Sequence, residues 1–249
     1  MDRHVSVSDS SSAATPREDW LRAGILAGFL ATFAMTVVLV GAYWLAEAIG
    51  SADGNTLQRW CYALVNNPVA ERTADGVVLA IGANLAMGLL LALAYAWYVE
   101  PRLDGPSWWK GLRFSLVPWL LSLIVFLPLM GGGVFGMDIG AGPLPIIGNL
   151  ILHLVYGAVL GSSYAEAAED WLDDTDEDRA NAASAERGAA VGLVTGLVAG
   201  AILGWAAAPG FDDLASRPLT TIGIAFIGAA IGLGIGSFAG MSRQPAARR

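Results

Sequence analysis

The sequence predicts an all-α integral membrane protein, a bundle of about six transmembrane helices. Of its 249 residues, 55% are hydrophobic and 14% are charged, and the mean hydropathy is +0.55. Soluble domains carry about 25% charged residues. The charges of this chain lie in short stretches, and the apolar runs between them reach the roughly 20 residues that a helix needs to cross a bilayer.

Six apolar segments are long enough for this purpose. The first is longer than the roughly 7–15 apolar residues of a signal peptide, so we expect it to remain as a helix. Trp and Tyr residues lie near the ends of several segments, at the depth that these side chains favour in membranes. The six predicted spans cover about residues 21–46, 76–98, 112–130, 144–165, 188–208 and 218–240.

The distribution of basic residues predicts the orientation of these spans. With six spans, eleven of the 14 Lys and Arg residues fall on one side of the membrane, and only Arg59, Arg72 and Arg217 fall on the other. Basic residues concentrate in cytoplasmic loops, so both termini should be cytoplasmic in a multi-pass protein of the cell membrane. An odd number of helices would break this alternation.

Composition changes along the chain divide it into five parts. The N-terminal residues are polar and rich in Ser, and an acidic segment separates four of the spans from the last two. We predict a disordered cytoplasmic tail at 1–19, a four-helix transmembrane module at 20–166, an acidic cytoplasmic linker at 167–187, a two-helix hairpin at 188–241 and a cytoplasmic tail at 242–249.

Glycine recurs at every fourth position in both helices of the predicted hairpin. Residues four apart share one helix face, and glycine there lets another backbone approach closely. The favoured interpretation is a glycine-zipper hairpin in which the two helices pack against each other. The alternative is a homo-oligomer or even a pore. The series consists of Gly188, Gly192, Gly196, Gly200 and Gly204, followed by Gly228, Gly232, Gly236 and Gly240.

Four polar side chains inside the spans form a candidate intramembrane polar cluster: Thr36, Asn84, Asn149 and His153. Polar groups at this depth are costly unless they are paired, so we expect the four to converge inside the first four helices. Asn149 and His153 share a face with Tyr156. Two outcomes remain open, a hydrogen-bonded cluster that fixes packing or a polar cavity in which His153 changes charge near neutral pH.

The third span and the loop after it contain residues that disturb a helix. Pro118 and Pro128 each remove a backbone donor and can kink the span. The glycines from Gly131 to Gly142 then predict a loose outer loop with close turns. A re-entrant loop is the alternative, and it would require burial by protein.

Several functions are disfavoured by what the sequence lacks. His153 and His4 are the two histidines and Cys61 is the one cysteine, which excludes a bis-His haem site, a His-rich zinc site and a cysteine metal cluster within one chain. We therefore expect no cofactor and no enzyme. A net charge of −8 with Lys110 as the only lysine argues against nucleic acid and resembles the composition of halophile proteins.

The first module resembles a known family. Its features are Ala23-Gly24-x-x-Ala27-Gly28 with Met35-Thr36, the run FLPLMGGGVFG, and the run HLVYGAVLG. They resemble small four-helix membrane proteins of a family of unknown function, over about residues 20–166. The C-terminal part resembles glycine-zipper membrane segments, and neither resemblance implies an activity.

Two functions from different classes follow from these observations. The first is a non-enzymatic structural or interaction subunit within the membrane, whose partners are the lipid bilayer and other membrane subunits or a second copy. The second is a small-solute or ion transporter or channel with a polar site in the first four helices. Transporters usually combine broken helices with a polar midplane site, which Pro118, Asn84 and His153 suggest.

The orientation gives a first testable prediction. A tag at either terminus, or at Asp174, should be cytoplasmic, and a tag at Asn55 should lie outside, because the Lys and Arg count differs so strongly between the two sides. Protease protection in intact spheroplasts measures this. A cytoplasmic tag at Asn55 would contradict the six-helix topology.

Overall fold

The computed structural model describes residues 19–169, 176–211 and 216–241, and within these ranges it contains helices and turns but no strand. Six helices are long and apolar enough to cross a membrane, which confirms the predicted fold class. The predicted tails, apart from Asp19, and the centre of the acidic linker lie outside the described residues. The six spans are Trp20–Ile49, Val77–Arg102, Ser107–Leu129, Leu144–Ala168, Ala183–Gly210 and Arg217–Gly240.

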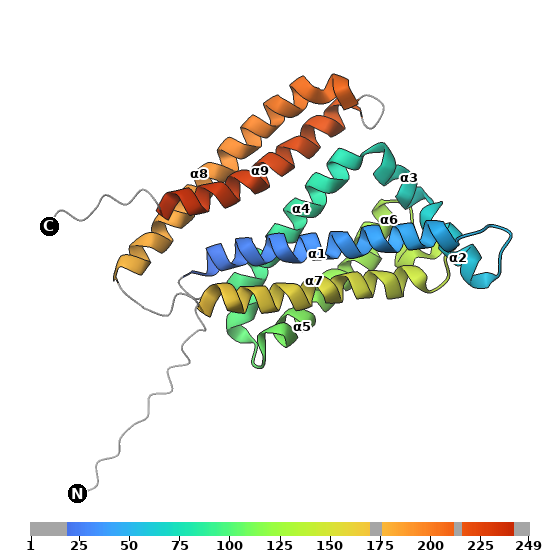
Figure 1. Cartoon of the computed structure of the whole chain (residues 1–249), viewed down its shortest axis with the longest axis horizontal. Coiled ribbons are helices and arrows are strands. Elements are labelled where there is room, and N and C mark those ends of the chain that lie inside the picture. The colour runs from blue at the N-terminus through green and yellow to red at the C-terminus, as the bar shows by residue number, and fades with distance from the viewer. Residues whose placement is uncertain (1–18, 170–175, 212–215, 242–249) are drawn as a thin grey trace, which may run out of the picture.

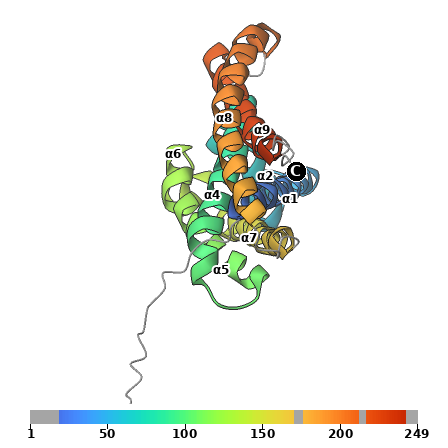
Figure 2. The same cartoon turned by 90° about the vertical axis from the view of Figure 1, so that its left-hand side faces the viewer.

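The first four spans form a bundle, and the last two form a hairpin on one side of it (Figures 1 and 2). The bundle consists of α1 (Trp20–Ile49), α4 (Val77–Ala94), α5 (Ser107–Leu121) and α7 (Leu144–Glu169), and the hairpin consists of α8 (Asp176–Ala207) and α9 (Arg217–Met241). α8 thus begins within the segment predicted as the linker.

Two of the spans contain a π-helical turn. α4 continues through the π-helical residues Tyr95–Val99 and a 3-10 turn, Glu100–Arg102. α5 continues through the π-helical residues Ser122–Phe126 into α6, Leu127–Leu129. Pro118 lies inside α5, and Pro128 follows the π turn. The sequence indicated a disturbance at these prolines but not its π-helical form.

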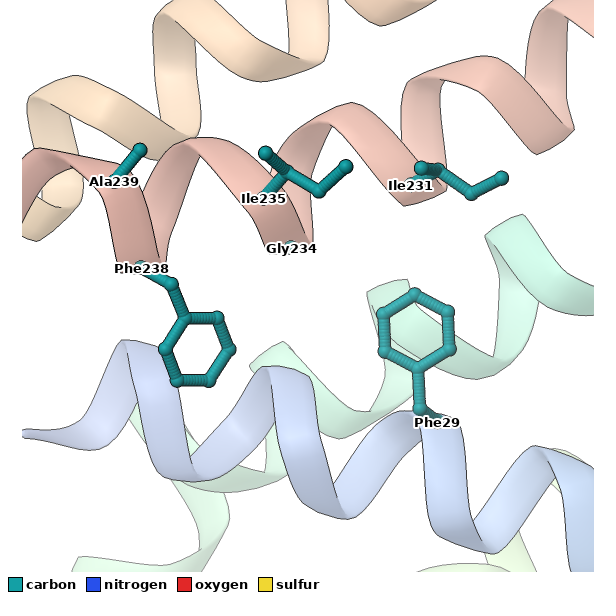
Figure 3. A pocket seen from close by; sticks show the side chains of 6 residues that line it. All are labelled: Phe29, Ile231, Gly234, Ile235, Phe238 and Ala239. Atoms are coloured by element: carbon teal, nitrogen blue, oxygen red, sulfur yellow. The ribbon is translucent and has the colours of Figure 1, made fainter.

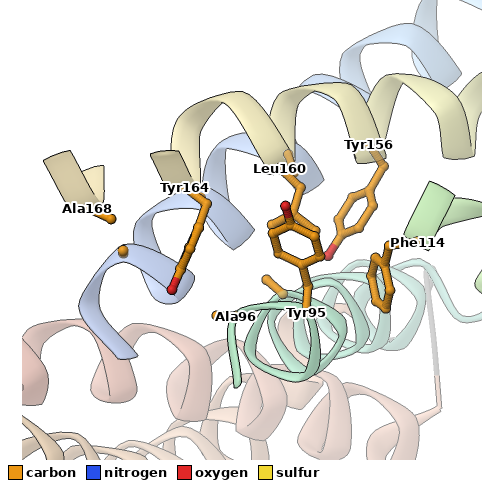
Figure 4. Packing of buried hydrophobic residues seen from close by; sticks show 11 residues of the cluster. Tyr95, Ala96, Phe114, Tyr156, Leu160, Tyr164 and Ala168 are labelled. Atoms are coloured by element: carbon orange, nitrogen blue, oxygen red, sulfur yellow. The ribbon is translucent and has the colours of Figure 1, made fainter. Parts of the chain in front are cut away.

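Aromatic rings fill the half of the bundle nearest the start of α1. The fully buried Tyr95 ring lies 5.4 Å from the Phe114 ring and 5.7 Å from the Tyr164 ring, measured between centroids. Figure 4 shows Tyr156, Leu160 and Tyr164 of α7 pointing toward Tyr95. Small alanines of α1 pack against this cluster, so α1 lies close to the rings.

The opposite end of the bundle is closed by two short helices, α2 (Thr56–Val65) and α3 (Pro68–Asp75), which the sequence analysis did not predict. Asn55 and Gln58 form a reciprocal capping box at the start of α2. Asn67 accepts hydrogen bonds from Val69 N at 2.9 Å and Ala70 N at 3.1 Å at the start of α3. Capping side chains satisfy backbone donors that a helix start leaves unpaired.

The glycine-rich segment 131–142 packs against these helices. It contains the 3-10 turn Val134–Ile139, and Ile139 and Ala141 are buried with Leu123 and Leu127 of the third span. The prediction of a loose loop is therefore wrong, because the segment has partners in α2 and α3 that its composition does not reveal. Cys61 of α2 is also buried, with 6% of its surface exposed.

The two glycine series of the hairpin face each other. A Cβ placed on Gly192 would lie 2.8 Å from the carbonyl carbon of Gly232, and one on Gly196 would lie 2.9 Å from that of Gly228. Real Cβ atoms essentially never approach so closely. The backbones of α8 and α9 are thus in direct contact along this face.

The hairpin contacts the bundle mainly through α9. Gly223 packs against the backbone of Val78 and Leu79 of α4, and Gly82 of α4 packs against the Gly223 carbonyl. Closer to its C-terminal end, Gly234 lies beside Phe29 of α1. One face of α9 therefore meets α8, and another meets α4 and α1.

The hairpin contact predicts unequal effects of two neighbouring substitutions. Gly196→Leu should destabilise the fold by roughly 1–3 kcal/mol or more, because its side chain overlaps the backbone of α9. Leu197→Ala should be milder, since Leu197 is 42% exposed. Thermal unfolding in detergent, followed by intrinsic fluorescence, compares the two. Equal loss of stability would contradict the importance of the glycine face.

Candidate functional site

The candidate polar residues of α1 and α4 belong to one antiparallel helix crossing. Small residues recur at every fourth position on both helices and face each other in pairs. Because the helices are antiparallel, residue numbers rise along α1 from one pair to the next and fall along α4. A Cβ on Gly28 would lie 2.7 Å from the Ala92 Cβ, which shows how close the helices are. The neighbouring pairs are Gly24 with Ala96, Gly28 with Ala92, Thr32 with Gly88, and Thr36 with Asn84.

Thr36 and Asn84 form a hydrogen bond between the two helices. The side-chain nitrogen of Asn84 donates to Thr36 Oγ1 at 3.2 Å, and Thr36 Oγ1 donates to the Thr32 carbonyl at 2.8 Å. The Thr36 hydroxyl therefore both accepts and donates. Both side chains are half-buried, and their bond connects α1 to α4 where the small-residue series ends.

Tyr156 connects α7 to the same crossing. Its hydroxyl donates to the Gly88 carbonyl at 2.6 Å, and the side chain is 2% exposed. Thr32 Oγ1 lies against Gly88, is buried, and has no hydrogen-bond partner in the described part of the chain. Tyr156 was not among the four residues of the predicted cluster. Its position on the same helix face as Asn149 and His153 could have indicated that it belongs there.

Asn149 forms a second polar contact, between α7 and the third span. Its side-chain nitrogen donates to Ser122 Oγ at 2.6 Å, and Ser122 Oγ donates to the Trp119 carbonyl at 2.7 Å. Trp119 Nε1 in turn donates to the Ile146 carbonyl at 3.3 Å. Ser122 begins the π-helical turn, so these bonds hold α7 against an irregular part of its neighbour.

His153 bonds to its own helix. Its Nδ1 lies 2.8 Å from the Asn149 carbonyl oxygen, which only accepts, so Nδ1 carries a proton. In the neutral ring, Nε2 is then the unprotonated nitrogen. The side chain is 9% exposed, so it lies within the bundle rather than on its outer surface.

The structure thus arranges the four predicted residues in two groups. Thr36 and Asn84 bond to each other, whereas Asn149 bonds to Ser122 and its carbonyl accepts from His153. Between the two groups, no direct side-chain hydrogen bond occurs in the described residues. None of these side chains has to carry a charge. The bonds of Asn84 and Asn149 join helices that pack against each other, whereas the bond of His153 lies within α7.

A double-mutant cycle tests the bond between α1 and α4. Thr36→Val and Asn84→Leu should show a coupling of about 0.6 kcal/mol, and at most about 1.7, as for other hydrogen bonds between membrane helices. Thr36→Val and Asn149→Leu should be additive, because these residues belong to different groups. Unfolding of the full chain in detergent–denaturant mixtures measures both. Additivity of the first pair would contradict the bond.

Comparison with known proteins assigns the chain to a family. The profile of a family of unknown function (DUF6789) matches residues 19–172, from the start of α1 past the end of α7, and it ends before α8. No curated protein matches the chain, and no solved structure does. Because the match covers more than half of the chain, and the part that forms the four-helix bundle, this protein belongs to the family of unknown function DUF6789.

Proposed function

We propose that this protein is a non-enzymatic structural or interaction subunit of the cell membrane, with both termini in the cytoplasm. The main support for this proposal is that polar side chains within the spans form hydrogen bonds between helices. Asn84, Asn149 and Tyr156 each donate to a different helix. Hydrogen bonds of this kind connect membrane helices, and they favour a role in packing.

The hairpin supports the same proposal. We interpret α8 and α9 as a glycine zipper within one chain, because each glycine of the central part faces the other helix. A glycine face that is used inside the chain is not available to line a contact between copies. This favours the hairpin over the pore, and it leaves the outward faces of α8 and α9 to lipid or to other subunits.

A specific observation favours a second candidate, a small-solute or ion transporter or channel. The π-helical turn Ser122–Phe126 interrupts the third span directly beside Asn149. Single π turns are frequent at functional sites, and discontinuous helices near polar groups are typical of transporters. His153 lies one turn from Asn149, so a transport site would include both.

Purification and flux measurements on the full chain separate these candidates. The subunit proposal predicts that a partner is retained at fixed stoichiometry when the tagged protein is purified from its own membranes in mild detergent. It also predicts no flux of ions or small solutes above that of protein-free liposomes. A protein that purifies alone and conducts would overturn it.

The variant His153→Gln sharpens the transport outcome, because it keeps a polar side chain of similar reach and should preserve fold and abundance. Flux that is pH-dependent in the parent protein and lost in this variant would support transport at the α7 site. Asn84→Leu is the matched variant, since it removes a polar side chain from the other group. Flux lost only in Asn84→Leu would assign the site to the α1–α4 crossing.

A further inference from the structure

An apolar groove lies between α1 and α9, where the hairpin meets the bundle. It has a volume of about 580 Å³, and Phe29 of α1 lines one side of it. Figure 3 shows the Phe29 and Phe238 rings extending from the two helices into the space between them, with Gly234 between them on α9. The residues that line the groove are Phe29, Ile231, Gly234, Ile235, Phe238 and Ala239.

The groove exists because glycine occupies its floor. Gly234 is buried, and a Cβ there would lie 3.4 Å from Phe29 Cε2, in ordinary van der Waals contact. A longer side chain at this position would occupy the groove itself. Ile231 and Ile235 on the rim are 49% and 65% exposed, so the groove opens toward the surface that the bilayer surrounds.

The groove extends through about two thirds of one membrane leaflet. It runs from Phe238, beside Arg22 in the first turn of α1, to Phe29, seven residues further along that helix. Seven residues of helix rise about 10 Å, and one leaflet contributes about half of a hydrocarbon core roughly 30 Å thick. Arg22 thus lies at the level of lipid headgroups, and Phe29 lies deep in the same leaflet.

The basic residue at the headgroup end is Arg22, of whose surface 9% is exposed. The Arg22 guanidinium carbon lies 5.7 Å from the centroid of the Phe238 ring, so this ring touches both the cation and the groove. Arg22 also forms an ion pair with Asp19, with Nη1 and Oδ1 3.5 Å apart. A lipid phosphate at this position would share the cation with that carboxylate.

The size of the groove decides what kind of occupant fits. A single hydrocarbon chain is narrow enough to lie between the two rings. Left unfilled in a bilayer, the groove would deprive its lining of dispersion contacts.

We propose that this groove binds one acyl chain of an anionic phospholipid, with the phosphate at Arg22. The lipid belongs to the leaflet at the termini of the chain, and it fills the angle between α1 and α9. It therefore acts as a bound component that joins the hairpin to the family module, distinct from the lipids that surround the protein.

Photocrosslinking in vesicles tests the proposal. The full chain is reconstituted in phosphatidylcholine with a small fraction of phosphatidylglycerol that carries a diazirine in one acyl chain, and crosslinked peptides are located by mass spectrometry. Crosslinks per exposed residue should be several-fold more frequent at residues 231–239 than at 37–45, an exposed stretch of α1 that serves as the reference for surrounding lipid.

Variants that fill the groove should remove this excess. Gly234→Leu should lower crosslinking at 231–239 several-fold and leave that at 37–45 unchanged. Ile231→Trp fills the groove from its exposed rim, so it applies even where Gly234→Leu fails to fold. Gly41→Leu, at a position with no neighbouring atom within 4 Å, is the matched control and should change neither yield at 231–239 nor stability.

The assignment of the lipid phosphate to Arg22 is tested separately. Arg22→Gln should abolish the preference for photoreactive phosphatidylglycerol over photoreactive phosphatidylcholine at 231–239. Crosslinking at 231–239 that equals the reference, or that persists in both groove-filling variants, would overturn the proposal. An unchanged lipid preference in Arg22→Gln would overturn the assignment of the phosphate to Arg22.

Discussion

Close contact between helix backbones, at faces where side chains are small or absent, is the interaction on which this structure depends. Lipid is as apolar as the helices, so no hydrophobic force draws them together, and association relies on dispersion and hydrogen bonds. Both strengthen when backbones approach. The α8–α9 hairpin uses its glycine series in this way, and α5 and α7 do so where Gly111 meets Gly157 and Gly161. The α1–α4 crossing combines glycine with alanine and threonine.

The polar side chains complete these contacts. Thr36 and Asn84 are the last pair of the α1–α4 series, and Tyr156 reaches a carbonyl of the same series, at Gly88. Gly88 is essential to this arrangement, because Thr32 occupies the space that a side chain there would need. A hydrogen bond between helices contributes little energy on average, but it is satisfied in one register only. The small residues thus permit the approach, and the polar residues select the alignment.

Sequence patterns predicted the features that repeat and missed those that occur once. Long apolar runs and glycine at every fourth position are periodic, so the six spans and the glycine face of the hairpin were visible. Thr36 and Asn84 were identified because polar residues are rare in such runs. Ser122 was missed, because a serine in a helix can bond to its own backbone and gives no sign of a partner. The helices α2 and α3 were missed because they have only ten and eight residues, too few to form a membrane span, and with them the burial of the glycine-rich segment was missed.

The contact between hairpin and bundle follows from the same constraint with a different result. At Gly223 the backbone of α9 touches that of α4, since neither Gly223 nor Gly82 carries a side chain. Toward the C-terminal end, α9 faces α1, where Phe29 and Phe238 stand between the helices. α9 therefore touches α4 at one end and is separated from α1 by aromatic rings at the other, and the groove lies between α9 and α1. Because the profile of the family ends before α8, the groove is a property of the combined chain: one wall comes from the family module and the other from the hairpin.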